Sequence, residues 1–208
     1  MTPSLCNADA ATFWAWRRWP EFTHLKAIAA TVVIVPIVGF CEWDPNQPLD
    51  TEETLLLSVL RAASESRTPD QTLLVTPPLR FVVGPDARCA FAVDVPTAHA
   101  FIAEVAASVV TDGFRRIVLL NSSPWNEELV AAASRDLRIA LRAQFFTIHL
   151  SALGLDFHAR RAPDHSRLIK AIECGGDAAA AIHLRGLLAE IQAHPPLAQG
   201  GRIFPAQL

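Results

Sequence analysis

Residues 31–39, with the sequence Thr-Val-Val-Ile-Val-Pro-Ile-Val-Gly, constrain the fold of this chain more than any other stretch. A continuous run of mostly β-branched residues that ends at glycine is typical of a strand buried on both faces. Such strands belong to parallel sheets that helices cover on both sides. Residues 31–39 therefore predict a central strand of an α/β sheet.

An acidic loop, residues 40–52, follows this predicted strand directly. Four negative charges on one loop repel each other, so a bound cation or water must stabilise them. Two interpretations are open: a ligand or metal site, and a solvated loop that caps the next helix. The carboxylates would lie just past the carboxyl end of the strand, where open α/β sheets bind ligands, and they are Glu42, Asp44, Asp50 and Glu52.

Helical and extended patterns alternate along the rest of the chain. The predicted helices cover 51–66, 96–112, 126–141 and 177–193, and further strands cover 73–76, 113–121 and 145–150. This alternation predicts an α/β fold with a mainly parallel sheet flanked by helices. His149 alternates with apolar neighbours in the last strand, which favours a packed position over a ligand role.

Length and composition indicate a single domain, residues 1–208. Of the 208 residues, 51% are hydrophobic, which is enough for one sizeable core. The formal net charge is −3 and no basic stripe carries interleaved aromatics, so nucleic-acid binding is not expected. The four cysteines lack CxxC spacing and no signal peptide or long apolar span is evident, which predicts reduced thiols, a cytoplasmic location and no membrane contact.

Both ends of the chain have an unusual composition. Residues 1–26 are rich in aromatic side chains, namely Phe13, Trp14, Trp16, Trp19 and Phe22. Either a strap that packs on the sheet or a subunit interface would account for them, since Trp is enriched at interface cores. Residues 194–208 form a Pro- and Gly-rich tail whose role cannot be read from the sequence.

Residues 39–52 resemble the first motif of the creatininase (creatinine amidohydrolase) family, in which a hydrophobic strand leads into a pattern close to Gly-Ser-x-Glu-Gln-His-Gly-Pro-His-Leu-Pro-Leu-x-Thr-Asp. Glu52 stands in place of the final Asp, and residues 113–121 resemble a second family strand. The resemblance covers about residues 19–192 and implies a three-layer creatininase-like fold in an oligomer. The matching residues are Gly39, Cys41, Glu42, Pro48, Leu49 and Thr51.

Three histidine positions of the family carry other residues here: Asp44, Ala87 and Ser123. A serine hydroxyl is a poor replacement for an imidazole nitrogen as a ligand of Zn²⁺ or Mn²⁺. Trp125 replaces a small or acidic residue and is too large for a site shaped to admit a small cyclic amide. The resemblance therefore implies a degenerate metal site, and we interpret Trp125 as a plug in an unused cavity.

The segment 157–166 is similar to the family's His-Ala-Gly-x-x-Glu-Thr-Ser motif. His158 matches its first histidine, and Asp164 and His165 could lie where Glu and Thr belong. These residues could join the acidic loop in a rebuilt metal site. Alternatively, two positive side chains could neutralise that loop through ion pairs without any metal, namely Arg160 and Arg161.

The leading hypothesis is a creatininase-like protein whose metal centre has eroded and which serves as a non-catalytic binding, scaffolding or regulatory subunit, with no cofactor. Its expected partner is a second copy of the chain or an active relative. A small-molecule sensor that uses the remaining pocket is a third possibility, which ligand-induced stabilisation would reveal.

The alternative is a working metal-dependent amidohydrolase that acts on a cyclic amide or another C–N bond. Bound Zn²⁺ or Mn²⁺ would lower the pKa of a water molecule and polarise the carbonyl. His158 or Asp164 would assist proton transfer to the leaving nitrogen. The metal ligands would be Glu42, Asp44, Glu52 and His165.

Overall fold

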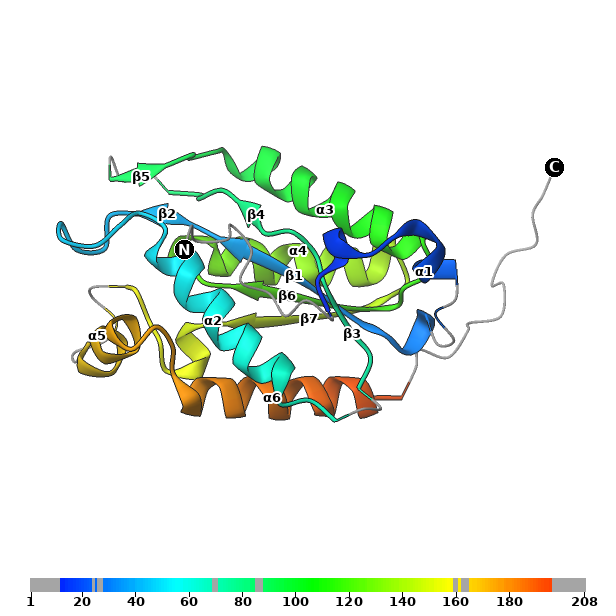
Figure 1. Ribbon diagram of the computed structural model, residues 1–208. Coiled ribbons are helices and arrows are strands. Elements are labelled where there is room, and N and C mark those ends of the chain that lie inside the picture. Colours follow the sequence, from blue (N-terminus) through cyan, green and yellow to red (C-terminus); the bar gives the residue numbers. More distant parts are fainter. Residues whose placement is uncertain are drawn as a thin grey trace.

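The computed structural model describes residues 12–23, 25, 28–68, 71–84, 88–158, 161 and 165–195. Its helices, labelled in Figure 1, are α1 (Trp19–Thr23), α2 (Thr51–Glu65), α3 (Val95–Thr111), α4 (Glu127–Ala140), α5 (Ser166–Glu173) and α6 (Ala178–Ala193). The strands are β1 (Val32–Val38), β2 (Phe40–Cys41), β3 (Leu73–Val75), β4 (Leu79–Arg80), β5 (Cys89–Ala90), β6 (Arg116–Asn121) and β7 (Gln144–His149). Short 3-10 helices are η1 (Trp14–Trp16), η2 (Ile28–Ala30), η3 (Pro124–Asn126) and η4 (Ser151–Leu153).

Strand β1 is central, and every residue in it is buried. It pairs in parallel with β6 on one side and with β3 and then β4 on the other, while β7 continues the sheet beyond β6. The order β3-β1-β6-β7 confirms the mainly parallel sheet that the alternating sequence pattern predicts. The apolar run is thus the middle of the sheet because it can be buried on both faces.

Pro36 lies inside this central strand without breaking it. The backbone N–H of Thr76 bonds Ile34 on the β3 side, whereas the N–H of Ser122 bonds Ile37 on the β6 side. Backbone groups of alternate residues point to opposite sides, so Pro36 faces the side on which β3 ends and β4 begins. The missing N–H of proline therefore falls at a gap in the ladder.

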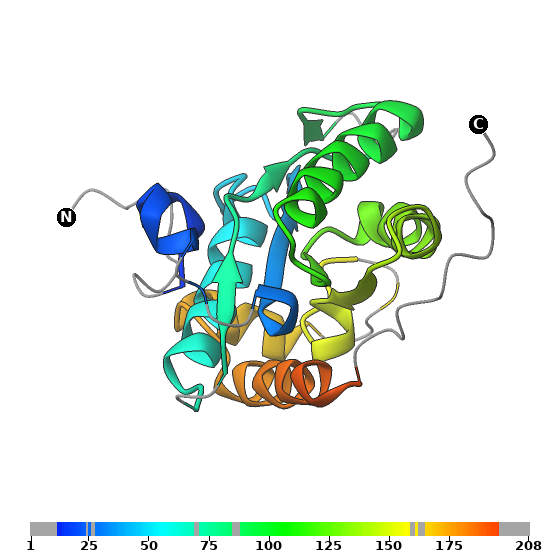
Figure 2. The ribbon, with the colours of Figure 1, turned by 90° about the vertical axis from the view of Figure 1, so that its right-hand side faces the viewer.

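Helices cover both faces of the sheet, as Figures 1 and 2 show. Helices α2, α5 and α6 share one core with β1, in which Leu56, Leu60 and Leu184 are fully buried. Helices α3 and α4 share the other, through Ile102 and Val130. The three-layer α/β fold is therefore confirmed. Within the described ranges, no helix has both the length and the apolar character needed to cross a membrane.

The predicted helices and strands are all present, with boundaries shifted by up to three residues. Two features escaped the sequence patterns. Helix α5 has only eight residues, and the antiparallel pair of β2 with β5 has two residues in each strand. Elements this short show no clear apolar periodicity. The β2–β5 pair matters for the site, because it extends β1 beyond the main sheet.

The aromatic N-terminal segment divides into a packed part and an exposed part. Phe13 is buried and forms an isolated bridge with Val75, and the ring of Trp14 lies 5.1 Å from that of Phe114. Packing against the sheet therefore accounts for these residues. Trp16 and Trp19 are 53% and 72% exposed, so the interface interpretation stays a prediction for them.

Arg116, at the start of β6, is a buried charged residue that joins four parts of the chain. Its guanidinium donates to the backbone oxygens of Ala30, Gln192 and His194 at 3.3, 2.9 and 2.7 Å. It also donates to the side-chain oxygen of Gln144 at 3.2 Å. These bonds fix the C-terminal end of α6 against the amino end of the sheet.

Candidate functional site

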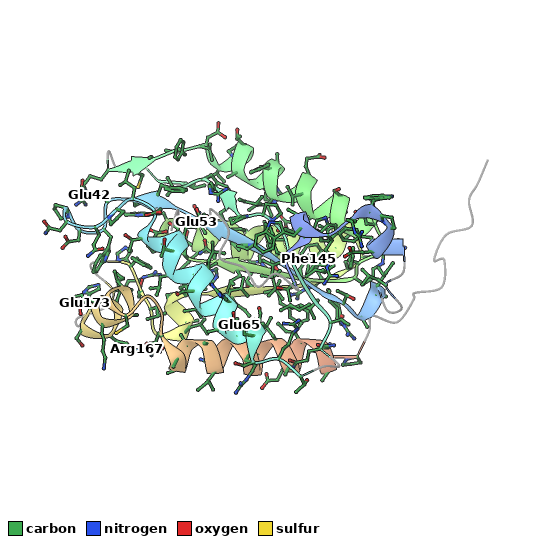
Figure 3. The ribbon with its side chains drawn as sticks, in the orientation of Figure 1. Glu42, Glu53, Glu65, Phe145, Arg167 and Glu173 are labelled. Atoms are coloured by element: carbon green, nitrogen blue, oxygen red, sulfur yellow. The ribbon has the colours of Figure 1, made fainter. Side chains whose placement is uncertain are left out.

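A pocket of about 300 Å³ lies at the carboxyl ends of β1 and β6, the edge at which the acidic loop begins. Figure 3 labels Glu42 at this end of the molecule. Open α/β sheets bind ligands at this edge. The pocket is lined by Cys41, Glu42, Trp43, Glu52, Arg88, Cys89, Pro124, Trp125, Phe157 and His158.

The base of the pocket is built by a close approach between the ends of β1 and β6. A Cβ atom placed on Gly39 would lie 2.6 Å from Ser123 Oγ and 2.9 Å from Glu52 Oε2, so only glycine fits there. Asn121 Nδ2 donates to the backbone oxygen of Ser123 at 2.8 Å, which fixes the turn after β6. Asn126 bonds the backbone of residues 81 and 83, which ties the same turn to the segment after β4.

Glu52 is the buried acid of this base and is only 1% exposed. Burial raises the pKa of Glu52 from its ordinary value of 4.5 to about 7, although the Gly39 backbone and the neighbouring hydroxyls of Ser122 and Ser123 oppose the rise. The adjacent buried Glu53 is paired with Arg80, whose guanidinium donates two hydrogen bonds to its carboxylate at 2.8 and 2.6 Å. Glu52 therefore holds a proton over much of the pH range below neutrality.

Ser123 stands at one of the three positions where the family that the sequence resembles has a histidine. It is fully buried beside Glu52. Its Oγ has no hydrogen bond of good geometry to any described residue. An unpaired buried hydroxyl costs free energy. Glu52 thus lines the pocket, and the buried hydroxyl of Ser123 lies next to it behind that lining.

Gly39→Ala should lower the free energy of unfolding by about 2–3 kcal/mol, because the new methyl group overlaps Ser123 and Glu52. Urea denaturation would measure the change. Gly186→Ala, in α6 with no atom within 4 Å of the added Cβ, should instead stabilise by about 0.5–1 kcal/mol. Combining Gly39→Ala with Ser123→Gly should recover part of the loss. An unchanged stability of Gly39→Ala would contradict the close approach.

The residues predicted as site residues separate into two groups in the structure. Glu42, Glu52 and His158 line the pocket. Asp44 and His165 do not: the Asp44 carboxylate accepts the Asn46 backbone N–H at 2.7 Å, and the His165 ring lies 6.2 Å from that of Trp43. The His165 Nε2 atom is buried without a hydrogen-bond partner among the described residues. Asp164, Ala87 and Arg160 lie outside the described residues.

Trp125 forms a wall of the pocket. It is 37% exposed, and its ring lies 5.7 Å from the ring of His158. A cavity of about 300 Å³ remains beside it, and the interpretation of Trp125 as a plug stays a prediction. The indole packs beside Gly84, where an added Cβ atom would lie 3.6 Å from it, at ordinary contact distance.

Arg161 does not neutralise the acidic loop. It bonds both carboxylate oxygens of Glu127 and, at 3.1 Å, the carboxylate of Asp156. Burial alone would raise the pKa of Glu127, but the bonds from Arg161 and Ser151 outweigh it and hold the pKa below its usual value. The ion-pair interpretation is therefore wrong for Arg161, which links Asp156 to Glu127 at the start of α4.

His149 lies outside the pocket lining, in agreement with a packed strand position. Asn121 Nδ2 lies 3.2 Å from His149 Nδ1. Burial lowers the pKa of His149, so the neutral ring that accepts this bond is favoured.

A divalent metal fits the described residues poorly. Within the described part of the chain, no three His, Cys, Asp or Glu side chains are grouped so that they could hold one. Glu52 is protonated up to about neutral pH and bonded to the hydroxyl of Ser122, and the β6 end offers the neutral Ser123. Hard carboxylate and imidazole donors in sets of three or more are what Zn²⁺ and Mn²⁺ need.

The sequence patterns missed several lining residues. Trp43 and Phe157 form the aromatic walls opposite Trp125, with ring centres 5.8 Å apart and nearly perpendicular planes. Arg88 and Cys89 lie at the start of β5 and also line the pocket. Trp43 is an apolar residue within an acidic loop, and this pattern could have indicated that it forms a wall of a site. No local sequence pattern indicates that Arg88 or Cys89 lines the pocket.

Comparison with known proteins places this geometry in a family. The model of the creatininase (creatinine amidohydrolase) family matches residues 16–182. No curated protein sequence matches the chain. The matched range includes the whole main sheet and the lining of the pocket.

Several solved structures share the fold. A protein assigned as a creatinine amidohydrolase of Bacteroides fragilis NCTC 9343 has a TM-score of 0.69 and 14% identity over 90% of this chain and 98% of its own. A creatinine amidohydrolase (creatininase) and a manganese form of creatininase each have a TM-score of 0.54 and 18% identity over 68% of this chain. The chain spans 59% of the length of these two.

Proposed function

We propose that this chain, which belongs to the creatininase family, is a non-catalytic member of it. Its pocket binds a small molecule, and the protein serves as a binding or regulatory subunit. The observation that carries the proposal is the make-up of the pocket base. There the acid Glu52, with a pKa near 7, lies beside the hydroxyl of Ser123 under an open cavity. Such a base suits hydrogen bonding to a ligand better than it suits a divalent metal.

The walls of the pocket support binding of a flat ligand. Trp43, Phe157 and Trp125 present aromatic surface, and His158 packs against Trp125. Aromatic side chains bind planar rings by offset or edge-to-face contacts. A volume of about 300 Å³ is at the small end of the range of ligand sites and fits a single-ring molecule.

The ligand's polar groups would form hydrogen bonds at the base of the pocket. The protonated Glu52 carboxyl, which lines the pocket, donates one hydrogen bond and accepts another, and the buried Ser123 hydroxyl lies behind it. Planar cyclic amides, ureas and amidines present the complementary N–H and C=O or C=N groups. Glu42 and Arg88 line the same pocket with charges of opposite sign.

We also propose that the subunit associates with a second copy or with an active relative. Trp16 and Trp19 support this, because they expose large apolar surfaces on the N-terminal segment. Sedimentation of the purified protein, compared with Trp16→Ala and Trp19→Ala, would give the subunit number. A cytoplasmic location is compatible with thiol cysteines and stays a prediction.

One observation favours the second candidate, a metal-dependent amidohydrolase. Glu42 and Glu52 line the same pocket, together with His158. If metal bound there, these side chains would hold it, and it would supply Lewis-acid chemistry to a carbonyl. Deprotonation of Glu52 above neutral pH would be required first.

Metal analysis and ligand binding separate the two candidates. Plasma mass spectrometry of protein purified without a His tag or chelator should find no stoichiometric Zn²⁺ or Mn²⁺, in the wild type or in Glu42→Ala. A panel of planar cyclic amides, ureas and amidines, beginning with creatinine, should contain compounds that raise Tm by about 5 °C at a hundredfold excess over Kd.

Matched variants make the ligand result specific. Trp125→Ala, which removes a pocket wall, should abolish the shift in Tm, whereas Trp19→Ala, an exposed tryptophan of the N-terminal segment, should keep it. Stoichiometric metal that is lost in Glu42→Ala would overturn the proposal in favour of the amidohydrolase. A panel without any binder would leave the pocket without a ligand of the proposed class.

A further inference from the structure

The short sheet formed by β2 and β5 brings together two cysteines that are far apart in the sequence. Cys41 lies directly opposite Cys89 in this antiparallel pair, beside one end of the main sheet in Figure 1. Directly opposite residues of an antiparallel pair point to the same face. Both cysteines accordingly line the pocket, and both are thiols in the structure.

The hydrogen bonds around the two cysteines define how close they are. The backbone N–H of Glu42 donates to the oxygen of Arg88 at 2.9 Å. A bond between the residue after Cys41 and the residue before Cys89 occurs when the two cysteines form a non-hydrogen-bonded pair. In such a pair the Cα atoms are about 4.5 Å apart, the closer of the two antiparallel spacings.

This spacing suits a disulfide. Disulfides form between Cα atoms about 4.4–6.8 Å apart and Cβ atoms about 3.5–4.5 Å apart. Cβ atoms of directly opposite strand residues lie about 4.5–5.5 Å apart, so a movement of up to about 1 Å closes the bond. Two-residue strands at the end of the sheet can make that movement more easily than the central strands.

We propose that Cys41 and Cys89 form a reversible dithiol–disulfide pair in the wall of the pocket. Cys89 is half-buried and Cys41 is 8% exposed, so Cys89 meets an incoming disulfide first. The Cys89 thiolate attacks a small disulfide, RSSR, to give a mixed disulfide and one RSH. The Cys41 thiolate then attacks the Cys89 sulfur, the second RSH leaves, and the two cysteines have lost two protons and two electrons to RSSR.

Closing the disulfide fixes the rim of the pocket. Glu42 and Trp43 follow Cys41 in the sequence, and Arg88 directly precedes Cys89. Glu42, Trp43 and Arg88 all line the cavity. A covalent link between β2 and β5 therefore limits how far the two sides of the pocket can separate. The inference does not rest on the proposed function, because its readout is the state of the two sulfurs.

The test is a redox titration of the full chain with mixtures of reduced and oxidised glutathione. Differential alkylation and peptide mapping would identify linked cysteines, with Cys174, which is exposed after α5, as an internal reference. A Cys6→Ser/Cys174→Ser background leaves only the proposed pair. We expect a Cys41–Cys89 link that dithiothreitol reverses, in both the wild type and this background.

Single variants test the cooperation of the two sulfurs. In Cys41→Ser or Cys89→Ser, the remaining thiol forms only a mixed disulfide with glutathione. Its protection from alkylation should fall about tenfold or more, because the local concentration of the second thiol is lost. Mixed disulfides on both cysteines of the wild type, a link from either to Cys6 or Cys174, or two thiols that stay reduced at every glutathione ratio would overturn the proposal. These outcomes are read from the wild type alone, whatever the stability of the variants.

Discussion

Glu52→Gln should raise the free energy of unfolding by about 3 kcal/mol at about pH 8 and change it little at about pH 4. Burial raises the pKa of Glu52 from 4.5 to about 7 in the folded protein. The folded state therefore binds the proton more tightly than the unfolded state. Its contribution to stability is complete below about pH 4.5, falls as the pH rises toward 7, and is lost above that pH. Glutamine keeps the shape of the Glu52 side chain and stays neutral at every pH, so the variant does not lose this stability as the pH rises.

Urea denaturation at several pH values in a chelating buffer would measure the effect as the difference between wild type and variant. Glu65→Gln is the matched control, because Glu65 is on the same helix but exposed and paired only with Arg61 at the surface. That variant should follow the wild-type profile. Parallel profiles for wild type and Glu52→Gln would show that Glu52 is not buried as an acid.

Arg116→Ala should lower the free energy of unfolding by about 3–5 kcal/mol. The variant leaves three partly buried backbone oxygens without their charged donor, those of Ala30, Gln192 and His194. Hydrogen bonds to charged groups are worth about 1.5–3 kcal/mol each, and water does not replace them readily in a buried position.

The neighbouring residue provides the control. Arg115 has an exposed side chain, so Arg115→Ala should change stability by no more than about 0.5 kcal/mol. Circular dichroism during urea denaturation measures both variants. Equal, small effects of the two substitutions would mean that Arg116 is not the residue that fixes the end of α6.

The sheet and its covering helices could be predicted because their signals are local. Residues 32–38 are apolar without interruption, and α3, α4 and α6 repeat apolar residues at helical spacing. The order of motifs was also sufficient to identify the family. The aromatic segment could be predicted to lie on the fold, but its division into buried Phe13 and exposed Trp19 could not.

The candidate site was predictable only in part. Glu42, Glu52 and His158 stand at motif positions and do line the pocket. Asp44 and His165 come from the same motifs but make other contacts, because a turn and a tryptophan ring occupy them. The partner of Arg161 is Glu127, thirty-four residues away in the sequence, which no local pattern indicates.

The sequence by itself determined the central strand, the alternating α/β order and the family, since propensity and hydrophobic periodicity act over a few neighbouring residues. Tertiary structure alone decided the properties of the site. Glu52 has a raised pKa because β1, β6 and α2 meet around it and exclude water. Cys41 faces Cys89, and Trp125 lines the same cavity as both, because segments distant in the sequence meet in space. Burial and register depend on what surrounds a residue in space, and a single sequence does not specify those neighbours.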